Sequence, residues 1–225
     1  MSLIAQQDTK FKNNRAQSTH SFHWIAYILG SIAFLLVIFH RVNSAVLVPY
    51  IIDTFQVSGT TLGLLSSIYF YVYSLSQPIV GILVGQLRPR KMLTLSVLLT
   101  SLGTFTFAYA SSIEIIYLGR AIISTGCAGI FIPVTLIINR CFHFEKTGVL
   151  LFMFQFVGNI GSILAAAPLA RLINQLGWET SLVSIAAFST ILGILIWITV
   201  KDNIDGNISL ENTEDEQNES GLQMI

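Results

Sequence analysis

Two arginines stand inside long apolar runs of a 225-residue chain. Arg41 lies 17 positions after one run begins at Trp24, and Arg120 lies seven positions after another begins at Ile113. A guanidinium stays charged in proteins and presents its N–H donors in a planar fork that matches carboxylate and phosphate groups. The two side chains are therefore candidates for holding an anion, either a soluble ligand or a carboxylate supplied by another chain.

The alternative is that Arg41 and Arg120 only extend towards lipid headgroups, as cationic side chains near helix ends do. An arginine at the centre of a membrane helix costs about 2.5–3.5 kcal/mol on insertion scales, and less near an interface. Both arginines are expected in the outer half of the bundle, a side that otherwise avoids basic residues, and this favours an inward-facing role. Glu114 is the only carboxylate in the predicted spans, and its six-residue spacing from Arg120 puts it on another face.

Polar side chains recur at helical spacing in three of the apolar runs. Residues three or four apart lie on one helix face. The stripes consist of Ser66, Tyr69, Tyr73 and Gln77; of Arg120, Ser124 and Cys127; and of Gln155, Asn159 and Ser162. Hydrogen bonding between helices, worth under about 1–2 kcal/mol each, explains any single hydroxyl. A water-accessible cavity is the second interpretation for the Tyr69–Tyr73–Gln77 stripe and for Gln155 with Asn159.

The apolar runs that carry these residues are expected to lie in a lipid membrane. The chain is 53% hydrophobic and only 11% charged, and its mean hydropathy is +0.69, whereas soluble domains carry about 25% charged residues. A helix crosses the hydrocarbon core with about 20 residues. The expected spans are 24–52, 61–85, 92–109, 113–138, 148–169 and 180–200. Because these runs are continuously apolar rather than alternating, we expect an all-α bundle of six transmembrane helices and not a β-barrel.

The basic residues of the short loops set the expected orientation, since cytoplasmic loops carry an excess of lysine and arginine. Arg171 is the only one expected outside. Those expected inside are Lys10, Lys12, Arg15, Arg88, Arg90, Lys91, Arg140 and Lys146. Both termini are therefore expected in the cytoplasm, as a polar tail over 1–23 and an acidic, disordered tail over 201–225.

Motifs of catalysis and of cofactor binding are missing from the sequence. It has no GxSxG, no HExxH, no Gly-rich phosphate loop after a strand and no CxxC. The two cysteines suggest no disulfide framework, and no basic patch with interleaved aromatics indicates nucleic acid. We expect no enzyme, no cofactor, no metal site and no nucleic-acid partner.

The basic turn between the second and third spans carries a family resemblance. The stretch GILVGQLRPRKML has Gly81, Leu83, Pro89, Arg90 and Lys91 in register with the signature G-x-L-x-D-R-x-G-P-R-R of the major facilitator superfamily. Further motifs follow in the right order: His40-Arg41 with Ser44 and Pro49, YFYVYSLSQPIVG, LGRAIISTGCAG and GNIGSILAAAPLARLINQLGW. Residues 24–200 thus resemble the N-terminal six-helix half of such a transporter, and most of all bacterial organic-solute carriers.

The turn also departs from the signature. Gly85 stands at the family's aspartate, Gln86 at its arginine and Arg88 at its glycine. In the family the aspartate engages the C-terminal half and holds one state of the transport cycle. The resemblance therefore implies a conformational-switch turn over Gly81, Gly85, Arg88, Pro89, Arg90 and Lys91, without its carboxylate.

The function that the resemblance implies is secondary transport of a small polar or anionic solute by alternating access. A full member has two six-span halves with the substrate between them, so a second copy or a separate C-terminal half is an expected partner, beside the lipid bilayer. The substrate candidates are Arg41, Tyr69, Tyr73, Gln77, Arg120, Gln155 and Asn159. The alternative is a truncated remnant or a non-transporting membrane interaction subunit. Either would be a multi-pass protein of a bacterial inner (cytoplasmic) membrane.

Overall fold

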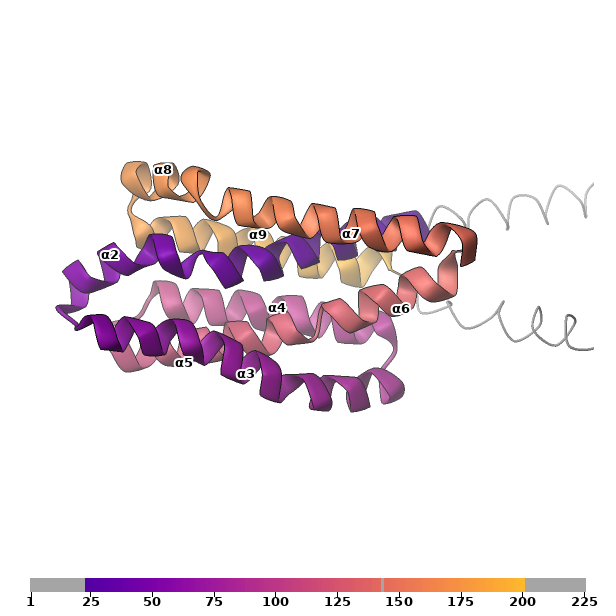
Figure 1. Ribbon diagram of the computed structural model, residues 1–225, viewed down its shortest axis with the longest axis horizontal. Coiled ribbons are helices and arrows are strands. Elements are labelled where there is room, and N and C mark those ends of the chain that lie inside the picture. The colour runs from indigo at the N-terminus through magenta and orange to yellow at the C-terminus, as the bar shows by residue number, and fades with distance from the viewer. Residues whose placement is uncertain (1–22, 143, 201–225) are drawn as a thin grey trace, which may run out of the picture.

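The computed structural model describes residues 23–142 and 144–200, and every regular element there is a helix. In chain order these are His23–Val42, α2 (Ser44–Phe55), α3 (Gly59–Gln86), α4 (Pro89–Ala108), α5 (Ile113–Ala128), α6 (Phe131–Cys141), α7 (Phe144–Leu164), α8 (Ala167–Leu176) and α9 (Trp178–Thr199). The helices form one elongated bundle, in which the first helix begins and α9 ends at the same end (Figure 1). Apart from His23, the predicted tails lie outside the described residues.

Six helices of the described chain are long and apolar enough to cross a membrane, which confirms the all-α, six-span prediction. They are His23–Val42, Gly59–Gln86, Pro89–Ala108, Ile113–Cys141, Glu145–Leu164 and Trp178–Thr199. The first expected span, 24–52, is in fact two helices, because the chain turns at Asn43 before α2 begins. The side chain of Asn43 is buried and bonded to groups of other residues, as described below.

Prolines mark two further breaks. A proline ring collides with the carbonyl four residues earlier and supplies no N–H to it. For Pro168 that residue is Leu164, where α7 ends, and the next helix, α8, begins at Ala167. For Pro133 it is Gly129, which lies in the interruption between α5 and α6. Pro78 interrupts nothing, since α3 is one helix of 28 residues.

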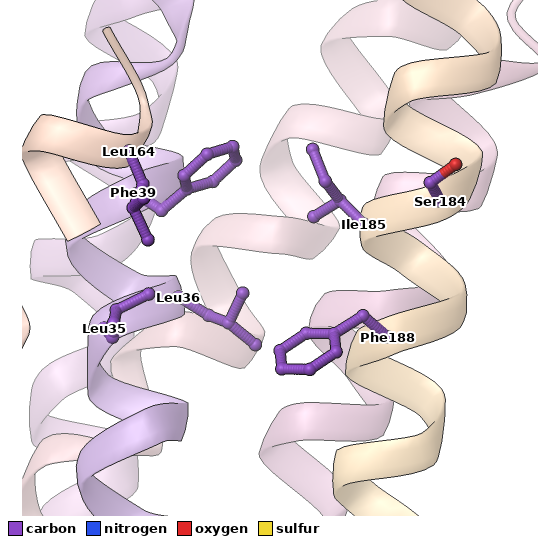
Figure 2. Close-up of a pocket in the computed structure, with 7 residues that line it drawn as sticks. All are labelled: Leu35, Leu36, Phe39, Leu164, Ser184, Ile185 and Phe188. Atoms are coloured by element: carbon purple, nitrogen blue, oxygen red, sulfur yellow. The ribbon is translucent and has the colours of Figure 1, made fainter. Parts of the chain in front are cut away.

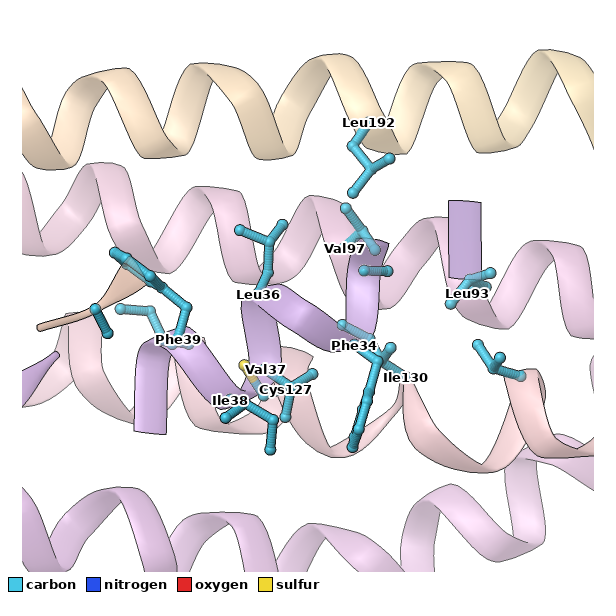
Figure 3. Close-up of a cluster of buried hydrophobic side chains, with 14 of the residues drawn as sticks. Phe34, Leu36, Val37, Ile38, Phe39, Leu93, Val97, Cys127, Ile130 and Leu192 are labelled. Carbon is cyan, nitrogen blue, oxygen red and sulfur yellow. The ribbon is translucent and has the colours of Figure 1, made fainter. Parts of the chain in front are cut away.

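The centre of the bundle is α4, which packs against both α5 and α9. The backbones of α4 and α5 touch: a Cβ at Gly103 would lie 2.9 Å from the Gly119 carbonyl oxygen, and one at Gly119 would lie 2.7 Å from the Phe107 nitrogen. Figure 3 shows the apolar core, where Val97 of α4 lies next to Leu192 of α9 and Val37 of the first helix lies next to Cys127 of α5. This close packing fixes the direction in which α5 presents its polar stripe.

Gly81 with Gly85 and Gly158 with Gly161 are two glycine pairs whose spacing permits close helix contact, and they behave differently. A Cβ at Gly158 would collide with the Phe34 ring, and one at Gly161 would collide with the Leu35 carbonyl oxygen, so α7 and the first helix do approach closely there. Around Gly81 and Gly85 no described atom lies within 4 Å of a built Cβ. Gly81 and Gly85 therefore lie on a face of α3 that is open in the described chain.

The spans formed by α3 and α7 bury the smallest share of their surface among the six. On α3, Tyr71 is 71% exposed and Leu75 is 74% exposed. On α7, Phe152 and Phe156 are exposed as well. These two helices therefore carry the bundle's largest uncovered faces.

Candidate functional site

Arg120 occupies the centre of the candidate site and is only 2% exposed. Its Nη1 donates to Asn43 Oδ1 at 3.1 Å, and its Nη2 donates to Ser44 Oγ. Its guanidinium carbon lies 4.7 Å from the centroid of the Tyr69 ring, on α3. One side chain of α5 thus joins the start of α2 and the middle of α3, which places Arg120 inward, as predicted.

The surroundings of Arg120 hold no compensating charge in the described part of the chain. Its hydrogen-bond acceptors are an amide and a hydroxyl, and its buried Nε has no hydrogen-bond partner. The described carboxylates, Asp53, Glu114, Glu145 and Glu179, are all exposed. A buried guanidinium whose donors are incompletely satisfied is costly unless another group completes its shell. Arg120 is therefore a positive centre whose donors, Nε–H among them, are not all satisfied.

Arg41 lies next to this centre and is half-buried. Its guanidinium carbon is 5.7 Å from the centroid of the Tyr73 ring, within the range of a cation–π contact. Its buried Nε also has no hydrogen-bond partner. The rings of Tyr69 and Tyr73 are stacked, with centroids 6.0 Å apart and planes 17° apart. Two arginines thus lie against two stacked tyrosines, one turn apart on α3.

Tyr69 is held by one hydrogen bond of its side chain and by another of its backbone. Its hydroxyl donates to the Val37 carbonyl oxygen of the first helix at 3.2 Å, and its own carbonyl oxygen accepts from Ser124 Oγ of α5. Farther along α3, Gln77 Nε2 donates to the Ala128 carbonyl oxygen at 3.5 Å, beside the break after α5. The stripes predicted on α3 and α5 therefore face each other, with Arg41, Tyr69, Tyr73 and Arg120 in one group and Gln77 beyond it.

A network of hydrogen bonds between uncharged side chains, which the sequence did not predict, orients the Asn43 amide that accepts from Arg120. His40 is fully buried, with Nδ1 3.4 Å from Asn43 Nδ2 and Nε2 3.4 Å from Thr104 Oγ1. Thr104 Oγ1 donates to the Thr100 carbonyl oxygen at 2.7 Å, so it accepts from His40 Nε2–H. His40 Nδ1 then accepts from the Asn43 amide, which leaves Asn43 Oδ1 to accept from Arg120. The signal in the sequence for this network was the three-residue spacing of His40 and Asn43, which puts both on one helix face.

Gln155 and Asn159 do not join this group. Both are exposed on α7, and Asn159 Nδ2 donates to the Gln155 carbonyl oxygen of its own helix at 2.9 Å. A separate pocket of about 240 Å³ lies between the first helix, the end of α7 and α9. Figure 2 shows its apolar lining, with Leu36 and Phe188 directed toward one another and Ser184 as its only polar side chain. It has no charge with which to hold an anion.

The basic turn lies between α3 and α4, at the end of the bundle where the first helix begins (Figure 1). Pro89 is the first residue of α4, where its missing N–H costs nothing. The guanidinium carbon of Arg90 lies 4.3 Å from the centroid of the Trp197 ring, and Arg90 Nη2 donates to the Trp197 carbonyl oxygen at 2.5 Å. Lys91 is exposed. Arg90 is thereby fixed to α9, within the same half.

Six apolar spans around a buried cationic group define an integral, multi-pass membrane protein. The profile of the Major Facilitator Superfamily matches residues 29–217. The chain belongs to this superfamily of transporters.

Individual relatives are distant. The chain is 25% identical over 178 residues to the uncharacterized transporter YybO of Bacillus subtilis, covering 79% of this chain and 41% of that protein. It is 23% identical over 191 residues to the probable sulfoacetate transporter SauU of Cupriavidus necator (85% and 44%). It is 25% identical over 179 residues to the sodium-dependent phosphate transport protein 1, chloroplastic, of Arabidopsis thaliana (78% and 35%). The chain thus spans less than half the length of these relatives.

Solved structures show the same fold. A bacterial homolog of the human lysosomal transporter Spinster, inward-facing and unoccupied, superposes with a TM-score of 0.71 at 17% identity, covering 80% of this chain and 43% of that one. The peptide transporter POT in complex with sulfate superposes with a TM-score of 0.60 at 15% identity, covering 87% and 44%. The six spans correspond to somewhat less than half of either protein.

Proposed function

We propose that this chain is one half of a secondary transporter that moves a small anionic solute by alternating access. The observation that carries the proposal is the pair of arginines, each with an unpartnered Nε, against two stacked tyrosines. No described carboxylate lies buried among them. A site of this kind attracts an anion because low-dielectric walls strengthen each guanidinium's field.

The two arginines have different roles in this proposal. Both Nη atoms of Arg120 are bonded to the protein, so Arg120 supplies fixed positive charge together with its unpartnered Nε–H. Arg41 is half-buried and stacks on Tyr73, so it is the cation that the solute contacts first. Tyr73 and Gln77 supply neutral hydrogen-bonding groups along the same face of α3.

The relatives' names support an anionic cargo. One is described as a probable sulfoacetate transporter and another as a phosphate transport protein. Sulfoacetate and phosphate are small anions with several oxygen acceptors, which is the chemistry that a guanidinium fork matches.

A second six-span half completes the proposed transporter. The uncovered faces of α3 and α7 carry Tyr71, Leu75, Gln155 and Asn159, and we expect a partner half to pack against them. That half is a second copy of this chain or a separate C-terminal half. Rocking of the two halves would then expose Arg41 and Arg120 to each side of the membrane in turn.

Anion binding by the purified full chain tests the proposal without requiring the second half. A ligand that binds only the folded state raises the unfolding temperature in a concentration-dependent way. We expect phosphate or sulfoacetate to stabilise the wild type and the control variant Arg171→Gln, which removes an exposed charge at α8. Arg41→Gln should abolish the shift. A shift that persists in Arg41→Gln contradicts the proposed role of this residue, and no shift in any protein contradicts the anion site.

Uptake into proteoliposomes then tests transport itself. The chain alone and the chain with a candidate C-terminal half are compared for uptake of labelled phosphate and sulfoacetate. Uptake that needs Arg41 supports the carrier.

The second candidate function is a non-transporting interaction subunit, favoured by Gly85 at the turn and by the open apolar face of α3. An unfolding temperature that does not change with anion, a stable complex with the candidate C-terminal half and no uptake would together support that candidate instead.

A further inference from the structure

A groove with a volume of about 540 Å³ lies between α4 and α9, on the outside of the bundle. Its α4 side is formed by Lys91, Thr94, Leu95 and Leu98, and its α9 side includes Ile194 and Trp197. The volume falls within the range of about 300–1,000 Å³ that small-molecule sites occupy. Nothing in the anion site uses these residues, so the groove needs an explanation of its own.

The side chains that line the groove become less polar from the first turn of α4 onward. Lys91 is exposed in its first turn, and Thr94 follows three residues later on the same helix face. Leu95 and Leu98 continue that face, which becomes entirely apolar. Trp197, whose ring stacks under Arg90, lies on the opposite wall near Lys91. This order of cation, hydroxyl and hydrocarbon complements the phosphate, ester carbonyl oxygens and acyl chains of a phospholipid.

Two polar atoms at this place have no partner in the described protein. Thr94 Oγ1 is buried without a hydrogen bond, and the whole residue is only 6% exposed. The Nε of Arg90 is likewise buried and unpaired, although its Nη2 is bonded to Trp197. Unpaired buried polar atoms are rare and indicate a missing partner. The first turn of α4 adds the backbone N–H groups of Arg90 and Lys91, which follow Pro89 and have no intrahelical partner, and such groups favour an anion.

We infer that this groove binds one anionic phospholipid of the leaflet that surrounds the basic turn. The phosphate lies at Lys91 and the first turn of α4, with Arg90 beside it. The Thr94 hydroxyl, one helical turn deeper, donates to an ester carbonyl oxygen. The acyl chains lie on Leu95, Leu98 and Ile194, which are exposed or half-buried apolar side chains. Trp197 takes the interfacial position that tryptophan prefers in membranes.

Native mass spectrometry of the full chain in mild detergent tests the inference. Phosphatidylglycerol and phosphatidylcholine with identical acyl chains are titrated separately, so that only the headgroup charge differs. We expect preferential retention of phosphatidylglycerol, and about fivefold weaker binding after Lys91→Gln, the usual effect of one basic side chain near a membrane surface. Arg171→Gln, at the other end of the bundle, is the matched control and should bind like the wild type. Leu95→Trp, which fills the groove, should weaken binding of both lipids.

Competition with excess inorganic phosphate separates a lipid from a free anion. A lipid held by its chains as well as its headgroup is not displaced, whereas a bare phosphate site would be emptied. Equal retention of the two lipids, unchanged binding by Lys91→Gln, or displacement by phosphate overturns the inference. Because Lys91 is exposed, Lys91→Gln leaves the fold intact, which circular dichroism verifies. The anion-stabilisation assay on Arg41 is independent, so the two proposals fail separately.

Discussion

Arg120 Nη1 lies 3.1 Å from Asn43 Oδ1, so one hydrogen bond ties the middle of α5 to the turn between the first helix and α2. Asn43 is only 1% exposed, and its amide nitrogen is directed at His40. The turn at which the first apolar run divides is therefore also the support of the buried cation. Any change at Asn43 acts on the fold and on the anion site together, and two substitutions separate these effects.

Asn43→Leu removes the acceptor of a buried charged donor, and Asn43→Asp replaces it with a carboxylate. The leucine variant should lose about 1–3 kcal/mol of unfolding free energy, because Arg120 Nη1 is left unpaired. The aspartate variant should unfold at a higher temperature than the leucine variant but lose the shift caused by phosphate, because its carboxylate neutralises the site. Thermal unfolding in detergent, with and without phosphate, measures both. A leucine variant as stable as the wild type would show that this bond contributes nothing.

His40→Leu tests the neutral network behind Arg120. The substitution leaves the Asn43 amide and Thr104 without their shared partner, and we expect a loss of about 1–2 kcal/mol. If His40 acts by orienting Asn43, the effects of His40→Leu and Asn43→Leu are not additive, and their coupling energy is about 0.5–3 kcal/mol. A double-mutant cycle on unfolding free energy measures it. Strict additivity would mean that His40 contributes only its own packing.

Lysine substitutions distinguish the two arginines. Arg120→Lys keeps the charge but loses the fork that reaches Asn43 and Ser44 at once, so stability and anion binding should both fall. Arg41→Lys keeps a cation near Tyr73, and its stability should change by less than about 1 kcal/mol. Thermal unfolding of the two variants side by side, with phosphate titrated into each, gives the comparison. A silent Arg120→Lys would show that the fork from Arg120 to Asn43 and Ser44 contributes nothing beyond its charge.

The fold was predictable because hydropathy reports burial in lipid directly, and the arginines were predictable because a charge inside such a run is costly. Hydropathy carries no information about partners, however. It did not reveal that His40 and Asn43 connect Thr104 to Arg120, since those two partners stand 64 and 77 positions farther along the chain. Nor did it divide the first run at Asn43, whose side chain accepts a hydrogen bond from Arg120 of α5. Gly81 and Gly158 have similar local patterns, and only packing shows that Gly158 meets another helix while Gly81 faces open space.

Alanine at two glycines measures that difference. A Cβ at Gly161 would collide with the Leu35 carbonyl oxygen and lie 3.1 Å from the Phe39 nitrogen, both rigid backbone atoms of the first helix. Gly161→Ala should therefore cost about 1–3 kcal/mol, as overpacking does. Gly85→Ala meets nothing within 4 Å, and because alanine favours helix over glycine by up to about 1 kcal/mol, it should be neutral or stabilising. Unfolding temperatures of the two variants decide the point. If Gly85→Ala becomes destabilising only when a candidate C-terminal half is present, the open face of α3 is where that half packs.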